Sequence, residues 1–296
     1  MDIQTQLIQL FTWVCSVYDT HLQGQFQRWS NNPKEPDFSD QELMTIYIFG
    51  HLQGHRQCSA IQAYMLQHWL GWFPKLPSYE ACNRRLNTFH EIWPTAVQSL
   101  CPLLPDVTLT PSDQVLDSVP IMLAVRGRSC HAKVARDQAE QGYCATKKMY
   151  YYGLKLHLLG QKRYQQMPVP LGLCLTAAAR HDLPVLQDQF ATPLPGALFG
   201  DKAYCDQATA NALAAQGTTL CTPDKQARGQ TTYGVGESGL WSRFVSTMRQ
   251  PVESFFNWLI EKTGLQSAAK VRSSAGLTVH CYGKLTVAFY LLCFYP

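Results

Sequence analysis

The sequence predicts an α/β protein in which an all-α module precedes a domain of mixed strands and helices. Two observations carry this prediction. Between residue 2 and about residue 105, hydrophobic residues recur at helical spacings of three and four, beginning with Ile3, Leu7 and Leu10. After the prolines at positions 102, 105 and 111, short apolar runs alternate with helical segments. We therefore expect a helical domain over residues 1–108 and a second domain over residues 109–296.

The first domain is expected to consist of helices joined by short loops. Ser39, followed by Asp40 and Glu42, has the order typical of a helix cap and predicts the start of a helix. The expected helices cover residues 3–18, a segment that begins at residue 40, residues 59–69 and residues 78–93.

The second domain is expected to contain five strands. The predicted strands cover residues 115–125, 150–159, 169–176, 197–204 and 218–222. The predicted helices cover residues 182–190, 206–215, 249–262 and 276–295, with a polar loop over residues 224–239. Three strands, then helix, strand, helix, strand and helix is the element order of a ribonuclease H-like fold, a mixed five-stranded sheet with flanking helices.

Positive charge is concentrated in one segment of the chain. The 296 residues carry a formal net charge of +4, which by itself does not indicate a polyanion ligand. Between Arg126 and Arg163, however, there are nine lysines and arginines but only two acids, Asp137 and Glu140. Such a local excess is typical of a surface that binds nucleic acid, and the alternative is a solvated basic face.

Cysteine usage and the lack of sorting signals predict a cytoplasmic protein. Eleven cysteines occur without a Cys-x-x-Cys pair, as is typical of reduced thiols. The amino terminus lacks the basic region and cleavage site of a signal peptide. The longest apolar stretch, residues 285–295, is shorter than the roughly 20 residues of a membrane-spanning helix. We expect no association with a membrane.

Three acids stand where hydrophobic neighbours make a free carboxylate costly. Asp117 interrupts the apolar run 115–119, Asp201 follows Ala-Leu-Phe-Gly, and Glu253 lies two residues before a pair of phenylalanines. Carboxylates in such places are paired, protonated or bound to cations. A cluster that holds two Mg²⁺ ions, with Mn²⁺ as a substitute, accounts for all three, because oxygen ligands suit these ions. Two such ions catalyse phosphoryl transfer by activating the attacking oxygen and stabilising the leaving oxygen.

Each acid also has a plainer interpretation. Asp117 could be a buried acid tied to a lysine, and Asp201 could begin a turn or cap a helix. Asp182 and Asp206 stand just before predicted helices, so we assign them to helix capping.

Arg249 adds a polar neighbour to the third acid. Arg249 precedes Glu253 by four residues and Asn257 follows it by four, so the three share one helical face. An arginine there suits a DNA phosphate near the scissile bond. The alternative is an ordinary Arg–Glu pair on a solvated helix.

Five sequence blocks occur in an order that resembles a known family. They are Leu116-Asp117-Ser118-Val119-Pro120, Gln141-Gly142-Tyr143-Cys144-Ala145-Thr146-Lys147-Lys148, Tyr151-Tyr152-Gly153-Leu154-Lys155-Leu156-His157, Gly200-Asp201-Lys202-Ala203-Tyr204 and Arg249-x-x-x-Glu253. From about Leu116 to the carboxyl terminus, the ordered set resembles the DDE transposases of bacterial insertion sequences, most closely the insertion-sequence 982 family.

The resemblance implies that Asp117, Asp201 and Glu253 are the catalytic and metal-binding triad of a DNA transposase. Such an enzyme cuts double-stranded DNA at the ends of a mobile element and joins the freed 3′-hydroxyls to target DNA. The resemblance also implies that the amino-terminal helices recognise the terminal inverted repeats. Because two element ends must be paired, we expect a homo-oligomer, at least a dimer on DNA, in the bacterial cytoplasm and associated with the nucleoid.

Nine cations are candidates for DNA contacts. They are Arg84, Arg85, Arg126, Arg128, Lys147, Lys148, Lys155, Lys202 and Arg249. Arg84 and Arg85 fit a recognition helix, or else they are surface arginines on a packed helix, and each of the lysines could be solvated. Two other functions stay open, a DNA-binding or regulatory relic without catalysis and a structure-specific ribonuclease H-like nuclease that cuts without joining.

Overall fold

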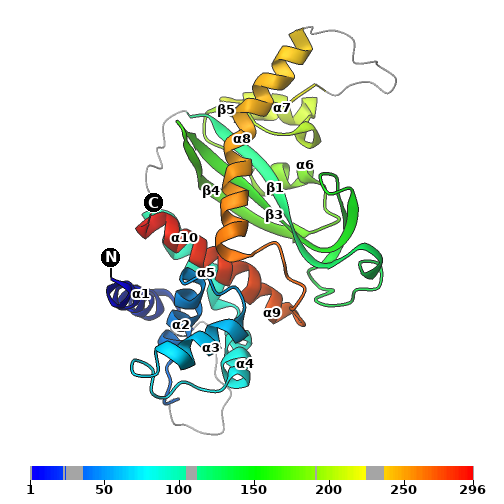
Figure 1. Cartoon of the computed structure of the whole chain (residues 1–296). Coiled ribbons are helices and arrows are strands. Elements are labelled where there is room, and N and C mark those ends of the chain that lie inside the picture. The colour runs from blue at the N-terminus through cyan, green and yellow to red at the C-terminus, as the bar shows by residue number, and fades with distance from the viewer. Residues whose placement is uncertain are drawn as a thin grey trace. The chain divides into compact units, whose positions relative to one another are not determined.

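The computed structural model of the chain describes residues 2–22, 24, 36–104, 112–190, 192–224 and 237–295. The chain divides into two compact units (Figure 1). We call residues 1–104 with 259–296 the helical unit, and residues 105–258 the sheet unit. The predicted boundary near residue 108 falls in a segment outside the described residues. Residues 259–296, which we expected in the second domain, group with the amino-terminal helices.

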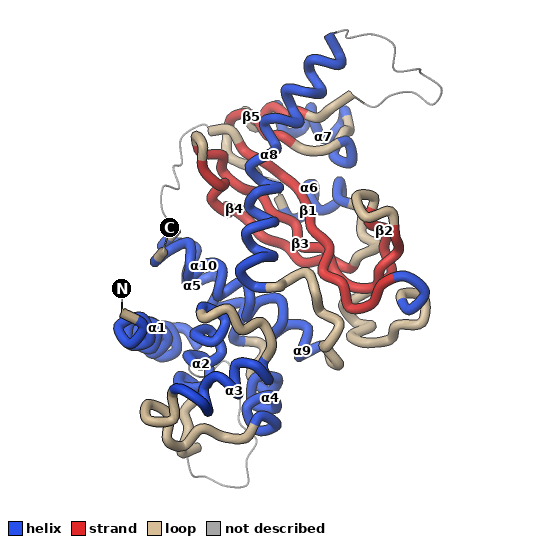
Figure 2. The backbone as a smooth tube through the Cα atoms, viewed as in Figure 1, coloured by secondary structure: helices blue, strands red, loops and turns tan. Residues whose placement is uncertain are grey.

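The helical unit contains no strand among its described residues, as the sequence predicted (Figure 2). Its elements are α1 (Ile3–Val17), η1 (Tyr18–Leu22), α2 (Asp40–Leu52), α3 (Cys58–His68), α4 (Tyr79–Thr88), α5 (Ile92–Leu100), η2 (Cys101–Leu103), the end of α8, α9 (Ser274–Thr278), η5 (Val279–Gly283) and α10 (Lys284–Phe294). The single helix predicted over residues 78–93 is two helices, α4 and α5. The chain turns between them around Phe89, which is buried at the turn.

The predicted cap at Ser39 is confirmed. The Ser39 hydroxyl accepts a hydrogen bond from the backbone N–H of Glu42 at 3.1 Å, and the Glu42 carboxylate accepts one from the backbone N–H of Ser39 at 2.6 Å. This reciprocal pair satisfies donors that the first turn of α2 would otherwise leave unpaired. The cap explains why the helix begins at Asp40.

The carboxyl-terminal helices provide much of the core of the helical unit. By length and composition, the helical segment over residues 274–294 could cross a membrane. However, 67% of its apolar stretch is buried within the structure. The Tyr47 hydroxyl donates to the carbonyl of Val279 at 3.4 Å, and the rings of Trp13 and Tyr290 lie 5.2 Å apart. The burial is what a core helix of a folded unit requires, because an apolar helix must cover its surface with other elements.

The sheet unit contains a mixed sheet with helices. Its strands are β1 (Gln114–Val125), β2 (Glu140–Cys144), β3 (Met149–Arg163), β4 (Gln166–Ala177), β5 (Gly196–Phe199) and β6 (Thr218–Cys221). Its helices are η3 (Arg126–Arg128), α6 (Asp182–Gln189), η4 (Lys202–Tyr204), α7 (Gln207–Ala214) and α8 (Glu237–Thr263), whose last residues belong to the helical unit. The prediction of a mixed α/β domain is confirmed.

The strand order is β2-β3-β1-β5-β6, with β4 also paired to β3. β1 is antiparallel to β3 and parallel to β5, and β5 is parallel to β6. β2 and β4 both pair with β3, β2 along residues 149–153 and β4 along residues 154–163. The five predicted strands are therefore present, and β2 is an additional one.

Three predicted boundaries differ from the structure. The fourth strand ends at Phe199 instead of Tyr204, because Asp201 caps the short helix η4. The short strand β2 was missed because its five residues include Gly142 and no alternating apolar pattern. Helix α8 begins at Glu237, so Pro251 lies inside it, where it has no N–H to bond to the carbonyl of Thr247. Of the predicted loop over residues 224–239, residues 225–236 lie outside the described residues.

Two glycines of the quoted sequence blocks allow strands to pack closely. A Cβ at Gly142 would collide with the carbonyl oxygen of Ala178, and one at Gly153 would collide with that of Ile121. Gly153 also has a φ of +159°. Side chains are thus excluded where β2 and β3 meet their neighbours, which is the physical reason for glycine at both positions.

Alternation along β1 separates two faces of the sheet. Leu116 joins a core cluster with Val185 and Leu186 of α6 and Leu213 of α7. Asp117, the next residue, points to the opposite face, where it contacts Arg249 of α8. Figure 1 shows α8 crossing the sheet in front of β1 and β3, with α6 behind them.

Candidate active site

Asp117 lies on β1, and Asp201 follows the end of the parallel neighbour β5 by two residues. In the β1–β5 pair, Val115 lies opposite Phe199, the last residue of β5. The charge of Asp201 contributes to the raised pKa of Asp117, so the two carboxylates lie near each other. The structure thus brings together two of the three predicted acids.

Among the described aspartates and glutamates of the sheet unit, Asp117 has the most strongly shifted pKa. Its side chain is 19% exposed. Oδ1 accepts a hydrogen bond from the backbone N–H of Ser118 at 2.8 Å, and Oδ2 accepts one from the Arg249 guanidinium at 2.8 Å. Burial raises the pKa of Asp117 to about 6, opposed by Arg249 and the Ser118 N–H and reinforced by the negative charge of Asp201. The positive charge of Arg249 therefore does not fully offset the cost of burying the Asp117 carboxylate near the Asp201 carboxylate.

Asp201 caps η4, in keeping with the plainer interpretation of this residue. Its Oδ1 accepts a hydrogen bond from the backbone N–H of Ala203 at 2.8 Å. The carboxylate is half-buried, whereas the next residue, Lys202, is exposed. Capping leaves the other carboxylate oxygen for a second role beside Asp117.

Tyr204 is a member of this group that the sequence analysis did not select. It is 1% exposed, and within the described residues its hydroxyl has no hydrogen-bond partner. Burial raises the pKa of Tyr204 well above its ordinary value, and the charges of Asp182, Asp117 and Asp201 add to the effect. Tyr204 lies near Asp182, Asp117 and Asp201 because the chain turns at η4. The sequence analysis had predicted a continuous strand there and so did not anticipate this turn.

Glu253 is the acid that the structure does not bring into the group. It lies on α8, about one helical turn after Arg249, and is exposed. Across the described parts of the chain, no three His, Cys, Asp or Glu side chains are grouped so that they could hold a metal ion. Arg249, not Glu253, contacts Asp117, and the Nε of Arg249 is buried and has no hydrogen-bond partner in those same parts.

A second polar cluster, which the sequence analysis missed, surrounds Asp182. Its Oδ1 accepts hydrogen bonds from Nζ of Lys155 at 3.0 Å and from Oγ of Ser118 at 3.3 Å, and lies 3.7 Å from Nδ1 of His157. We assigned Asp182 to a helix cap, but the N-cap residue of α6 is His181. The carboxylate instead faces a lysine and a histidine from β3.

His157 is the buried member of this second cluster. Burial lowers its pKa to about 4, although the Asp182 carboxylate acts in the opposite direction. Its Nε2 lies 2.9 Å from Oγ1 of Thr176. The alternation of Lys155 and His157 on one strand is the sequence signal that could have placed both on one face.

The predicted DNA-contacting cations fall into two groups. Some are exposed, namely Arg84, Arg126, Arg128, Lys147, Lys148 and Lys202. The others are partly buried and pair with acids: Arg249 with Asp117, Lys155 with Asp182, and Arg85 with Asp40 at 2.6 Å. Asp40 has a side-chain exposure of 1%, so Arg85 neutralises a buried acid in the helical unit.

The turn between β2 and β3 combines exposed lysines with exposed aromatic rings. Tyr143 and Tyr150 are cross-strand partners with ring centroids 5.1 Å apart, and they are 53% and 60% exposed. Lys147 and Lys148 lie in the turn that joins their strands. Cations next to exposed aromatic rings are the combination that proteins use to bind phosphates and bases.

The donor set around Asp117 and Asp201 suits a hard divalent cation. Carboxylate oxygens are the ligands that Mg²⁺ and Mn²⁺ prefer, and a nearby cation would offset the cost of burying the charged Asp117 beside Asp201. The pair can therefore bind positive charge, while the unpaired Nε–H of Arg249 can donate to an anion.

Comparison with known proteins was made for the whole chain. Residues 110–263, more than half of the 296 residues, match the family model described as Transposase DDE domain. Neither the curated proteins nor the solved structures gave a significant match. The matched range contains Asp117, Asp201, Arg249 and Glu253.

Proposed function

Because the chain belongs to the transposases that carry a DDE domain, we propose that it binds the ends of a bacterial insertion sequence, cuts the DNA there and joins the freed 3′-hydroxyls to a target. Within these transposases it is most like the insertion-sequence 982 family. The observation that carries the proposal is the proximity of Asp117, on β1, to Asp201, which follows the end of the parallel neighbour β5 by two residues. The sheet and the cap of η4 hold these two acids in place, as in-line phosphoryl transfer requires.

A ribonuclease H-like fold is part of the proposal. The order β4-β3-β1-β5-β6, with β1 antiparallel to β3 and parallel to β5, supports it. In this fold the catalytic domain is the sheet unit together with α8, and the amino-terminal helices form the module that recognises the terminal inverted repeats.

The catalytic carboxylates are Asp117, Asp201 and Glu253. A pair of Mg²⁺ or Mn²⁺ ions bound to them would activate the attacking oxygen and stabilise the leaving oxygen. The raised pKa of Asp117 supports cation binding at the two aspartates. Glu253 is exposed in the structure, so its participation requires its side chain or this part of α8 to turn toward Asp117.

Arg249 has a separate role in the proposed reaction. Its guanidinium holds Asp117 through one nitrogen and has a buried Nε–H without a partner among the described residues. We assign this donor to a non-bridging oxygen of the scissile phosphate. A preorganised charged donor stabilises the charge that develops there during strand cleavage.

Exposed cations of the sheet unit are assigned to the DNA backbone. Arg126, Arg128, Lys147, Lys148 and Lys202 would contact phosphates, with Tyr143 and Tyr150 stacking against bases near the cut. In the helical unit Arg84 would contact the terminal repeat. The enzyme acts as at least a dimer, because both element ends are joined to one target, and it works at the nucleoid.

Cleavage and joining assays with purified protein test the proposal. Asp117→Asn, Asp201→Asn and Glu253→Gln should each abolish cutting of DNA with element ends in Mg²⁺, while binding to that DNA is retained. Asp188→Asn is the matched control, because Asp188 is an exposed acid of the same unit that pairs with Arg180. Undiminished cutting by Glu253→Gln would remove it from the triad.

The same assay separates the two alternatives. A nuclease that does not join would release cut ends without strand-transfer products when target DNA is present. A regulatory relic would bind the ends and cut nothing under any divalent-ion condition.

A further inference from the structure

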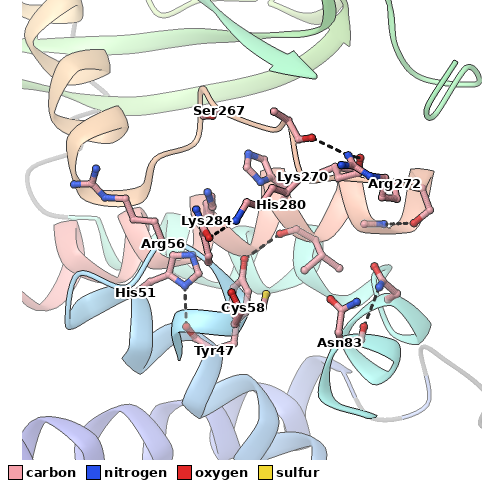
Figure 3. Close-up of a pocket in the computed structure, with 18 of the residues that line it drawn as sticks. Tyr47, His51, Arg56, Cys58, Asn83, Ser267, Lys270, Arg272, His280 and Lys284 are labelled. Carbon is pink, nitrogen blue, oxygen red and sulfur yellow. Dashed lines mark hydrogen bonds between the residues drawn. The ribbon is translucent and has the colours of Figure 1, made fainter. Parts of the chain in front are cut away.

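A second candidate site lies entirely within the helical unit. A pocket of about 350 Å³ is lined by the end of α2, the α2–α3 loop, α4 and residues between Ser267 and Lys284 (Figure 3). Its volume is in the range of about 300–1,000 Å³ that is common for small-molecule sites. None of the residues nominated from the sequence for catalysis or DNA binding lines it.

The lining of this pocket is strongly cationic. It includes Arg56, Lys270, Arg272 and Lys284, and it contains no aspartate or glutamate. The first three are exposed at the rim, whereas Lys284 is 4% exposed. Figure 3 shows Lys284 beside His51 and His280.

Within the part of the chain that the structure describes, the hydrogen bonds of these four cations go to neutral oxygens. Lys284 donates to the carbonyl of Gly264 at 3.2 Å, and Lys270 donates to the side-chain oxygen of Gln57 at 2.6 Å. Arg56 donates to a backbone carbonyl, and Arg272 donates to two. Burial lowers the pKa of Lys284 to about 8, and Arg56 acts in the same direction. A buried ammonium without an acid nearby is costly, so the pocket is short of negative charge.

His51 gives a second, independent indication of a ligand. It is 3% exposed and lines the pocket, and its Nε2 has no hydrogen-bond partner among the described residues. Its Nδ1–H donates to the Tyr47 carbonyl at 2.9 Å, so Nε2 carries the lone pair. Buried polar atoms of this kind are rarely left unsatisfied, and this lone pair needs a donor, which the O–H of a protonated phosphate or a water bound to the ligand supplies.

The number of cations in the lining favours a phosphate over a carboxylate. A phosphate offers several acceptor oxygens and more than one negative charge when it is a monoester, so it can engage several cations together. Guanidinium groups such as Arg56 and Arg272 match its geometry, and lysine binds it as a point charge.

We propose that this pocket of the helical unit is a phosphate-binding site, with Lys284 at its base and Arg56, Lys270 and Arg272 at its rim. The phosphate belongs either to a DNA backbone or to a free nucleotide or inorganic phosphate. The DNA source rests on the proposed function, whereas phosphate binding itself does not. In the DNA case, the carboxyl-terminal segment adds contacts to the amino-terminal helices on the terminal repeat.

The test measures binding to the full-length protein by calorimetry and by fluorescence anisotropy. The probes are inorganic phosphate, a nucleoside triphosphate and a short DNA duplex. Arg272→Gln and Lys270→Gln alter exposed side chains and should fold normally. Each should weaken phosphate binding by about 10-fold, the loss of one charged hydrogen bond. Lys75→Gln is the matched control, because Lys75 is an exposed cation of the same unit outside the pocket.

The outcomes separate the sources of phosphate. If DNA competes with inorganic phosphate and Arg272→Gln weakens both, the DNA backbone is the source. If only phosphate and the nucleotide respond to Arg272→Gln, the ligand is a free phosphate compound. If Arg272→Gln and Lys270→Gln bind every probe as Lys75→Gln does, the site does not exist. Binding of inorganic phosphate is measured without element-end DNA or divalent ions, so failure of the catalytic proposal is recognised separately in the cleavage assay.

Discussion

The sheet unit and the helical unit each bury a charge without enough opposite charge around it, and the two charges differ in sign. Burial raises the pKa of Asp117 to about 6 and lowers the pKa of Lys284 to about 8. In both cases the folded protein disfavours the charged form of the group, which costs stability near neutral pH. A cation at Asp117 and an anion at Lys284 would each offset that cost, so the same physics predicts ligands of opposite charge.

The two sites also differ in how readily they can be predicted from the sequence. Asp117 and Asp201 stand beside apolar residues within short, specific blocks of sequence. The cations of the pocket come from Arg56 and from the segment 270–284, and no motif connects them in the sequence. A motif marks the first site, and only the packing of distant segments creates the second.

Apart from the loss of a catalytic carboxylate, replacing Arg249 should have the largest effect on the reaction. Arg249→Met removes the donor assigned to the scissile phosphate, and we expect strand cleavage to slow by about 10²- to 10³-fold. The cleavage rate on intact ends and the joining rate on pre-cut ends measure this. Arg243→Met, an exposed arginine on the same helix, should cut at nearly the normal rate. Equal rates for the two variants would exclude Arg249 from the reaction.

Asp117→Asn should stabilise the protein while abolishing cleavage. The folded pKa of Asp117, about 6, lies above its ordinary value of 3.8, so the folded state binds more protons between about pH 4 and pH 6. The free energy of unfolding therefore falls as pH rises through this window. At pH 7.5 without divalent ions, we expect the variant to gain up to about 3 kcal/mol in urea unfolding.

The gain from Asp117→Asn should depend on pH and on metal. It should disappear below about pH 3, where the carboxyl is mostly protonated in both states. Mg²⁺ should raise the unfolding temperature of the natural protein more than that of the variant, because the ion binds only the folded state. An equal response to Mg²⁺ would argue against a cation at the two aspartates.

Lys284→Met tests the opposite charge in the helical unit. Removing a buried ammonium should raise the free energy of unfolding at pH 7 by about 2 kcal/mol, after allowance for the hydrogen bond lost at Gly264. The same variant should bind phosphate more weakly. Urea unfolding and calorimetry measure the two effects, and a variant that is both less stable and unchanged in binding would show that Lys284 serves only the fold.

Replacing an exposed lysine of the β2–β3 turn should have the smallest effect, and the effect should be on DNA affinity. Lys147→Gln and Lys148→Gln should each reduce the slope of DNA affinity against salt concentration by about 1, because each releases about one counterion. Titrations at several salt concentrations measure the slope. An affinity of the natural protein that does not depend on salt would contradict phosphate contacts altogether.

Much of the fold could be predicted from local patterns. The cap at Ser39, the apolar strand around Asp117 and the helix after Asp206 depend on neighbours within a few residues, and the structure has each of them. The split between α4 and α5, the strand β2 and the early start of α8 were missed. These features depend on packing or pairing partners that a short window of sequence does not contain.

The candidate site was predicted in part for the same reason. Asp117 and Asp201 lie together because their strands are neighbours in register, which the element order implied. Glu253 is exposed, Asp182 bonds to Lys155, and Arg85 bonds to Asp40. Those three outcomes depend on side-chain direction and on partners many residues away.

By itself, the sequence determined the types of most elements, the acids worth attention and the family, because periodicity, capping and motifs are local properties of the chain. Only the tertiary structure decided which charges meet. It placed Arg249 on Asp117, grouped residues 259–296 with the amino-terminal helices and brought Lys284 into one pocket with three other cations. Burial and distance set the strength of electrostatic interactions, and both are known only once segments far apart in the chain have packed together.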